Sequence, residues 1–154
     1  MKRNAAKHPL PSALPDPEGF IDSETQVAGV IGYPIRHTLS PAMHNAAFRA
    51  LGLNWVYLPF EVPPERLDGA IKGMRGLRLR GLNVTIPHKV EVIRYLDELT
   101  EAARRIGAVN TLFWEDSHLV GDNTDAGGFL QALRQAGFDA KGKRVLVVGA
   151  GGSA

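Results

Sequence analysis

The chain has 154 residues, a length that corresponds to one domain or one and a fraction. With 44% hydrophobic and 22% charged residues, its composition excludes a wholly disordered chain, a collagen-like repeat and a disulfide-stapled mini-protein. The formal net charge of only +2 argues against a nucleic-acid partner. No apolar run approaches the roughly 18 residues of a membrane helix, and cysteine and a secretory leader are both missing, so we expect a cytoplasmic protein without a membrane partner.

The chain begins with a proline-rich stretch and then alternates apolar runs with helical patterns. Residues 1–25 hold four of the ten prolines and no apolar periodicity, so we predict a disordered extension there. The apolar run at residues 27–33 predicts a buried strand. A helix is predicted to begin at Ser40-Pro41 and to end at Gly52, with one apolar face formed by Met43, Ala47, Ala50 and Leu51.

The same alternation continues along the rest of the chain. A strand at residues 55–60 contains Pro59, which places it near a sheet edge or a strand end. A helix at residues 125–136 has Phe129, Leu130 and Leu133 as its predicted core side. Further strands are predicted at 79–86, 109–114, 118–121 and 144–148, and further helices from Pro63 (with Leu67, Ile71 and Met74 as apolar positions), from Pro87 to Leu96 and from Thr100 to Ile106.

Strands separated by helices indicate an α/β fold, in which helices cover both faces of a mainly parallel sheet. The last predicted strand, residues 144–148, is apolar on both sides and needs neighbouring strands that this sequence does not contain. We therefore expect the chain to be the front part of a longer protein.

A glycine-rich loop follows this last strand directly. Gly149-x-Gly151-x-x-Ala154 matches the dinucleotide fingerprint, in which the first glycine makes a tight turn and the second lets backbone N–H groups approach a pyrophosphate at a helix N-terminus. Similar glycine turns also close βα units that bind nothing, and the residue that separates NAD from NADP would lie beyond Ala154. The predicted cofactor-binding residues of this loop are Gly149, Ala150, Gly151, Gly152, Ser153 and Ala154.

Four polar segments interrupt the apolar elements upstream, at residues 36–41, 83–89, 107–111 and 121–125. Three of them fall where a strand ends or a helix begins, which is where ligands bind in open α/β sheets. Their hydroxyls, amides, one ammonium and one carboxylate suit a small polyhydroxylated ligand better than a phosphate or a metal. The local alternative is that Ser40 and Asp125 cap helices and that Thr38, Thr85 and Asn110 satisfy loop backbones.

Lys89 is the residue that this local alternative explains least well. We predict it in the first turn of the helix after Pro87, where the helix dipole disfavours a cation. A lysine in such a place is suited to proton transfer, and a carboxylate such as Asp125 could orient it. The histidines, His88 among them, do not have the spacing of metal ligands, and we interpret them as surface or loop residues.

Taken together, these segments resemble the shikimate dehydrogenase family. The resemblance runs in order from about Val27 to the last residue. It implies a substrate-binding domain at residues 26–123, then a linker helix and the incomplete start of an NADP-binding Rossmann domain at residues 124–154, with catalysis between the two domains. The matching stretches are Val30-Ile31-Gly32-Tyr33-Pro34-Ile35, Ser40-Pro41-Ala42-Met43-His44-Asn45, Asn83-Val84-Thr85-Ile86-Pro87-His88-Lys89, Gly107-Ala108-Val109-Asn110-Thr111-Leu112, Gly121-Asp122-Asn123-Thr124-Asp125-Ala126-Gly127-Gly128-Phe129 and the terminal glycine loop.

The resemblance also implies an activity and a role for single residues. The activity is the reversible NADPH-dependent reduction of 3-dehydroshikimate to shikimate in aromatic amino acid biosynthesis, by a monomer or a homodimer. Lys89 would give and take the proton of the reacting hydroxyl, with Asp125 as its partner and as a substrate ligand. The remaining implied roles are the shikimate carboxylate for Thr38 and Ser40, ring hydroxyls for Thr85 and Asn110, and the nucleotide for Glu101, although no chemistry of Glu101 itself supports its role.

Two departures from the family pattern leave alternatives open. Thr38 stands where the family usually has serine, and its additional methyl group weakens the expected preference for shikimate over quinate. The alternatives are a quinate/shikimate dehydrogenase that uses NAD, and a non-catalytic module that binds a cyclic hydroxy acid. The rest of the nucleotide domain and the family's C-terminal helix are missing, so we expect the 154-residue chain by itself to be inactive.

Overall fold

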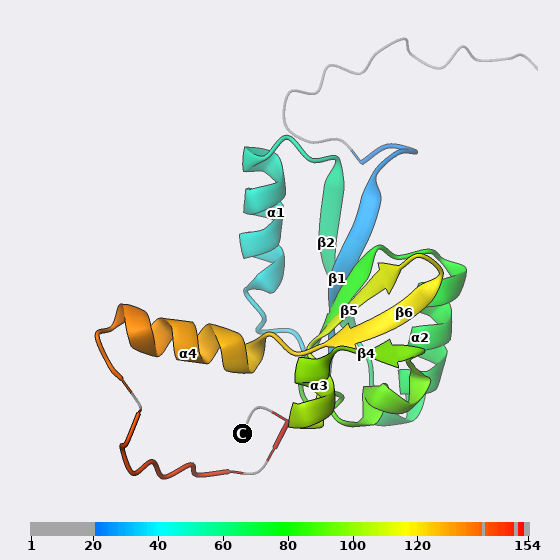
Figure 1. Cartoon of the computed structure of the whole chain (residues 1–154). Helices are drawn as coiled ribbons and strands as arrows, with labels where there is room; N and C mark the ends of the chain where they lie inside the picture. Colours follow the sequence, from blue (N-terminus) through cyan, green and yellow to red (C-terminus); the bar gives the residue numbers. More distant parts are fainter. Residues whose placement is uncertain (1–20, 140, 150, 153–154) are drawn as a thin grey trace, which may run out of the picture.

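In the computed structural model, which describes residues 21–139, 141–149 and 151–152, a mixed sheet of six strands forms the centre of the fold (Figure 1). The predicted α/β class with a mostly parallel sheet is confirmed: β1–β2, β1–β3 and β4–β6 are parallel pairs, whereas β3–β5 and β5–β6 are antiparallel. The strands are β1 (Gln26–Gly32), β2 (Trp55–Glu61), β3 (Gly81–Val84), β4 (Glu98–Leu99), β5 (Thr111–Glu115) and β6 (His118–Asp122), in the sheet order β2-β1-β3-β5-β6-β4.

Helices cover both faces of this sheet, as the sequence predicts. Ile31 of β1 packs in the main buried cluster with Leu67, Ile71 and Met74 of α2 (Leu67–Gly76). Its neighbour Val30 points to the opposite face, because successive side chains of a strand alternate, and it joins a second cluster under α1 (Ser40–Ala50). The other helical elements are η1 (Pro64–Arg66), η2 (Glu91–Tyr95), α3 (Glu101–Ile106) and α4 (Asp125–Gln135).

The predicted apolar face of α1 is wrong. Met43 and Leu51, which belong to that face, are 62% and 71% exposed. The packed side instead combines one apolar ring with two polar groups. Phe48 packs against the second cluster, the Asn45 amide accepts the backbone N–H of Tyr57 at 2.8 Å and donates to its carbonyl at 2.9 Å, and the His44 ring stacks on the Tyr57 ring. Because β2 is an edge strand, the backbone of Tyr57 needs a partner outside the sheet, and that need sets the rotation of the helix.

The predicted helix from Pro87 to Leu96 is also wrong. The chain makes two turns over residues 86–90, and then forms the short 3-10 helix η2. Lys89 therefore lies in a turn and not in the first turn of an α-helix, so the dipole argument does not apply to it. The backbone explains the difference, because the carbonyl of Lys89 accepts the N–H of Val109 at 2.7 Å in place of an N–H from its own helix.

At both ends of the chain the structure departs from the predicted boundaries. Residues 1–20 of the predicted extension lie outside the described residues, but Asp22 accepts a hydrogen bond from Asn54 at 3.0 Å, so order begins earlier than residue 26. At the other end, α4 has no buried residue, and Phe129 on its predicted core side is 65% exposed. Residues 144–148 form no strand, because no strand of the described chain lies beside them.

Among the described helices, none has the length and apolar content needed to cross a membrane.

Strand direction decides where the polar segments meet. β1 and β3 are parallel, so their carboxyl ends, and the residues that follow them, share one edge of the sheet. β5 is antiparallel to β3 and begins at that edge, and β6 is antiparallel to β5 and ends there. The segments that follow β1, β3 and β6 and the one that precedes β5 therefore converge, although they are far apart in the sequence.

Candidate active site

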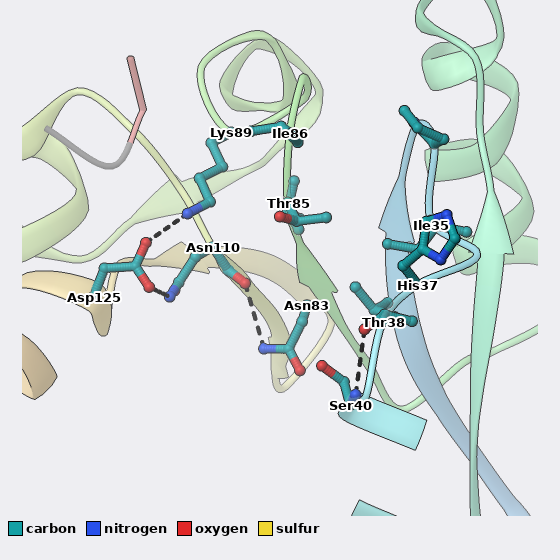
Figure 2. Close-up of a pocket in the computed structure, with 13 residues that line it drawn as sticks. Ile35, His37, Thr38, Ser40, Asn83, Thr85, Ile86, Lys89, Asn110 and Asp125 are labelled. Atoms are coloured by element: carbon teal, nitrogen blue, oxygen red, sulfur yellow. Dashed lines mark hydrogen bonds and ion pairs between the residues drawn. The ribbon is translucent and has the colours of Figure 1, made fainter. Parts of the chain in front are cut away.

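A pocket of about 420 Å³ opens at this edge of the sheet (Figure 2). Its lining comes from β1, the loop before α1, the end of β3 and the turns after it, the residue before β5 and the start of α4. All six residues that the sequence analysis assigns to catalysis and substrate binding line this pocket: Thr38, Ser40, Thr85, Lys89, Asn110 and Asp125.

The amine and the carboxylate meet inside the pocket. The Lys89 Nζ lies 2.7 Å from Oδ2 of Asp125, and the side chains are 11% and 40% exposed. The N–H of Asp125 donates to the Asn123 side chain at 3.0 Å, which fixes the first residue of α4. The helix-cap alternative for Asp125 is wrong, since the capping position is Thr124 and no side chain caps this helix. The carboxylate is therefore directed to Lys89 and not to the backbone of its own helix.

Asn110 holds the other oxygen of this carboxylate. Its amide nitrogen donates to Oδ1 of Asp125 at 2.7 Å and to the Thr124 hydroxyl at 2.9 Å, and its amide oxygen accepts the N–H of Thr124 at 3.0 Å. Asn110 is 9% exposed and makes these bonds directly before β5 begins. The two oxygens of Asp125 thus have separate partners, an amide and an ammonium, and the orientation of the carboxylate is set before any ligand binds.

Two hydroxyls lie at the opposite wall, where α1 begins. The Oγ1 of Thr38 accepts the backbone N–H of Ser40 at 3.2 Å. Ser40 is not the helix cap that the local alternative predicts, because Leu39 occupies the capping position and no side chain caps the helix. The first turn of α1 has no acidic residue. Hydroxyls at an uncapped helix N-terminus form a favourable environment for an anion such as a carboxylate.

Asn83, which belongs to the polar segment at residues 83–89 but had no predicted role, lines the pocket between these two walls. The Tyr57 hydroxyl donates to Oδ1 of Asn83 at 2.6 Å, and burial raises the pKa of Tyr57 to about 12, so this donor is protonated at neutral pH. The Asn83 amide nitrogen has only two long contacts, both at 3.4 Å. The signal was present in the sequence, because Asn83 stands between the core residues Leu82 and Val84 in a strand, where alternation turns it to the other face.

Part of the predicted cofactor loop approaches Lys89. Gly149 has a φ of 125°, which favours glycine, and a Cβ at Gly152 would stand 2.9 Å from the Cβ of Lys89, so only glycine fits there without displacement. The tight turn at Gly149 is what a dinucleotide loop requires of its first glycine. Ala150, Ser153 and Ala154 lie outside the described residues, and Gly151 has open space where its Cβ would be. A second, largely apolar pocket of about 650 Å³ lies beside the loop, between α4 and residues 145–148.

Glu101, which the resemblance assigns to the nucleotide, and the histidine His88 both lie outside the lining of this pocket. Glu101 is the first residue of α3, its side chain is 86% exposed, and it does not line the pocket. His88, interpreted as a surface or loop residue, lies in the loop between two turns but is only 1% exposed, so it is not a surface residue. Within the described part of the chain, no group of three His, Asp or Glu side chains could hold a metal ion.

Comparison with known proteins agrees with this geometry. The sequence model of the family described as "Shikimate dehydrogenase substrate binding domain" matches residues 30–112. A relative from Rubrobacter xylanophilus named shikimate dehydrogenase (NADP(+)) is 56% identical over 135 residues, which are 87% of this chain and 48% of the relative.

Two solved structures are similar over the same region. A crystal structure of shikimate dehydrogenase in complex with NADP⁺ has a TM-score of 0.81 and 45% identity, and the match covers 90% of this chain and 48% of that one. Shikimate 5-dehydrogenase from Listeria monocytogenes, in complex with shikimate and NAD, has a TM-score of 0.76 and 48% identity over 80% of this chain and 43% of that one. The chain spans about half the length of the curated relatives it matches. Because the family model matches more than half of its residues, the chain belongs to the shikimate dehydrogenase substrate-binding domain family.

Proposed function

We propose that this chain supplies the substrate site of a shikimate dehydrogenase, which reversibly reduces 3-dehydroshikimate to shikimate with NADPH. The observation that carries the proposal is the Lys89–Asp125 pair, 2.7 Å apart in a pocket whose other walls carry hydroxyls and amides. Oxidation of an alcohol requires a group that removes the hydroxyl proton, and an amine oriented by a carboxylate is such a group. The names of the similar proteins support the same reaction.

In this mechanism Lys89 exchanges a proton with the reacting oxygen. When shikimate is oxidised, the amine takes the hydroxyl proton, and in the reverse direction the ammonium returns it to the oxygen of 3-dehydroshikimate. Asp125 holds the amine in place and balances its charge, while Asn110 keeps the carboxylate turned toward it. The nicotinamide of NADP, when bound, supplies the hydride donor or acceptor.

The remaining lining residues suit the rest of the substrate. Thr38 and Ser40, at the N-terminus of α1, bind the carboxylate, because their hydroxyls and the helix dipole favour an anion. Thr85 and Asn110 contact ring hydroxyls. The volume of about 420 Å³ lies within the range of pockets that bind small molecules.

The glycine loop is the part of the chain that suits the nucleotide. We assign Gly149, Gly151 and Gly152 to NADP binding, with the substrate-binding domain at residues 26–123 and the start of the nucleotide domain at 124–154. The positive φ of Gly149, which allows the tight turn of such a loop, supports this assignment. Glu101, a cytoplasmic location and a monomeric or homodimeric state stay predictions from the resemblance. NAD is the competing cofactor, because the Listeria enzyme was crystallised with it.

Replacement of Lys89 by alanine tests the proposal in the gene product that carries this chain. We expect shikimate-dependent NADPH formation to fall by about 10²- to 10⁴-fold, the usual contribution of general acid–base catalysis, while shikimate still binds. Lys72→Ala is the matched control, since its ion pair with Asp68 is 2.8 Å long but 74% exposed on the lysine side. Unchanged turnover in Lys89→Ala would remove Lys89 from the mechanism.

Assays on the wild-type gene product distinguish the alternative functions. Parallel assays with quinate and with NAD⁺ determine the substrate and the cofactor. If the wild-type protein binds shikimate, measured by calorimetry, but reduces neither cofactor, the non-catalytic binding module is the correct interpretation.

A further inference from the structure

His88 precedes Lys89 and has no role in the mechanism above, although it is one of the most deeply buried polar residues of the described chain, at 1% exposure. Its Nε2 lies 2.6 Å from the backbone carbonyl oxygen of Val62. A carbonyl can only accept a hydrogen bond, so Nε2 carries the hydrogen and donates it. The ring is therefore held in one orientation.

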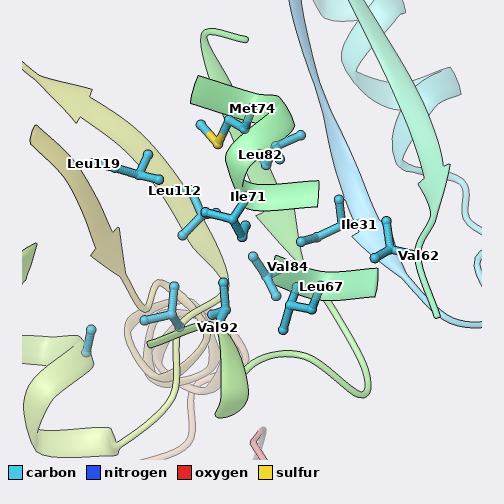
Figure 3. Close-up of a cluster of buried hydrophobic side chains, with 12 residues drawn as sticks. Ile31, Val62, Leu67, Ile71, Met74, Leu82, Val84, Val92, Leu112 and Leu119 are labelled. Carbon is cyan, nitrogen blue, oxygen red and sulfur yellow. The ribbon is translucent and has the colours of Figure 1, made fainter. Parts of the chain in front are cut away.

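The backbone of His88 is bonded as well. Its N–H donates to the carbonyl of Thr85 at 2.9 Å, and its carbonyl accepts the N–H of Val92 at 2.9 Å. Val62 and Val92 both belong to the main buried cluster (Figure 3). His88 thus connects the turn after β3 with the hydrophobic core on two sides.

These bonds lie immediately beside the reacting amine. On the other side of the turn, the carbonyl of Lys89 accepts the N–H of Val109 at 2.7 Å, next to Asn110. The backbone of Lys89 is therefore fixed on both sides. The preceding residue, His88, is bonded to the carbonyl of Val62, and the carbonyl of Lys89 itself is bonded to the N–H of Val109. A long, flexible side chain reaches a partner at 2.7 Å reproducibly only when its backbone is fixed, and displacement of a reacting group by about 1 Å can cost 10²-fold in rate.

We propose that His88 is a positioning residue for proton transfer: its ring N–H, bonded to the Val62 carbonyl, fixes the turn that holds the Lys89 amine against Asp125. This inference rests on the proposed function of Lys89. It concerns a residue that contacts neither the pocket nor the reacting atoms, and it acts only through its neighbour.

Two substitutions of His88 by amide residues test whether a donor must reach the Val62 carbonyl or whether any polar side chain at this position is sufficient. In His88→Gln the amide nitrogen can take the place of Nε2 and reach Val62, whereas in His88→Asn the same group is one methylene too short. In the full gene product we expect kcat to fall about 10- to 100-fold in His88→Asn and to stay within about 3-fold of wild type in His88→Gln, with the KM for shikimate little changed in both. The same two substitutions at the exposed His118 of β6 are the matched controls and should leave kcat unchanged.

Equal kcat values for His88→Asn and His88→Gln would overturn the inference, whether both are active or both impaired. It would also be overturned if His88→Asn lowers the melting temperature but keeps its kcat at temperatures well below melting, because the role would then be structural only. A second measurement does not depend on turnover: the rate at which an amine-directed reagent modifies Lys89, followed by mass spectrometry. We expect this rate to rise about five-fold in His88→Asn and not in His88→Gln, as the ion pair with Asp125 loosens.

If the wild-type protein does not oxidise shikimate, the proposed function fails, yet the modification rates still decide whether His88 positions Lys89. Equal modification rates in all three proteins would refute the positioning role, even if the enzyme is active.

Discussion

Replacement of Asp125 by asparagine removes the charge that faces Lys89 and keeps the size of the side chain. Fully buried ion pairs cost about 3–5 kcal/mol when one partner is lost, and exposed pairs about 0–1 kcal/mol. The pair in this site lies between these limits, since Lys89 is 11% exposed and Asp125 is 40% exposed. The energy that holds the Lys89 amine in its reactive position therefore falls by on the order of 2 kcal/mol. Because only the amine held in that position exchanges the proton, about 1.4 kcal/mol for each factor of ten gives a fall of about 30-fold in kcat/KM.

The asparagine cannot restore the lost interaction by turning its amide. Its oxygen is required by the Asn110 amide at 2.7 Å, so its nitrogen, a donor, would face the lysine ammonium, which is also a donor. The assay is the initial rate of NADPH formation with shikimate. Asp68→Asn is the control, because the Lys72–Asp68 pair has nearly the same length, 2.8 Å, but side chains 74% and 50% exposed. A kcat/KM for Asp125→Asn within three-fold of wild type would refute the reasoning.

Two further predictions concern the loop and the stability of the fold. Gly152→Ala places a Cβ 2.9 Å from that of Lys89, so we expect kcat at saturating NADP⁺ to fall about 10-fold, whereas Gly73→Ala, whose Cβ meets open space, leaves kcat unchanged. The hydrogen bond from the Arg75 guanidinium, and to a smaller extent the backbone N–H of Leu119, hold the pKa of Asp97 below its ordinary 3.8. The ionised carboxylate therefore stabilises the fold above that pH. Because both side chains are 35% exposed, Asp97→Asn should cost about 1 kcal/mol, or 2–4 °C of melting temperature at pH 7. Thermal unfolding should show this difference shrinking as the pH falls below 3.8.

The elements that the sequence predicts well are those in which local periodicity and burial agree. Leu67, Ile71 and Met74 recur at the spacing of one helical face and are buried in α2. The turn between β5 and β6 falls at Asp116, where φ is 53°, a conformation that aspartate tolerates. In these places a short window of sequence contains the information that the fold uses.

The errors arise where a distant partner decides the outcome. The rotation of α1 follows from an amide, Asn45, that satisfies the edge backbone of Tyr57, so Met43 on the predicted apolar face stays exposed. The burial of His88 could not be predicted, because nothing near it in the sequence shows that the carbonyl of Val62 lies 2.6 Å from its ring. Hydrophobic periodicity carries no signal for a polar side chain that packs through hydrogen bonds.

The candidate site shows the same division between local and long-range information. Polar residues at strand ends could be recognised one segment at a time, but their meeting depends on the sheet order β3-β5-β6, which no single segment specifies. Two antiparallel steps return β6 to the direction of β3, so the residues that follow both strands lie at the same edge, with the start of β5 between them. The gap to be crossed is therefore two strand spacings, roughly 10 Å. A lysine after β3 and a carboxylate after β6 can meet across such a gap only because the lysine side chain is long. The amide of Asn110, directly before the intervening strand, lies where it can orient the carboxylate toward the lysine.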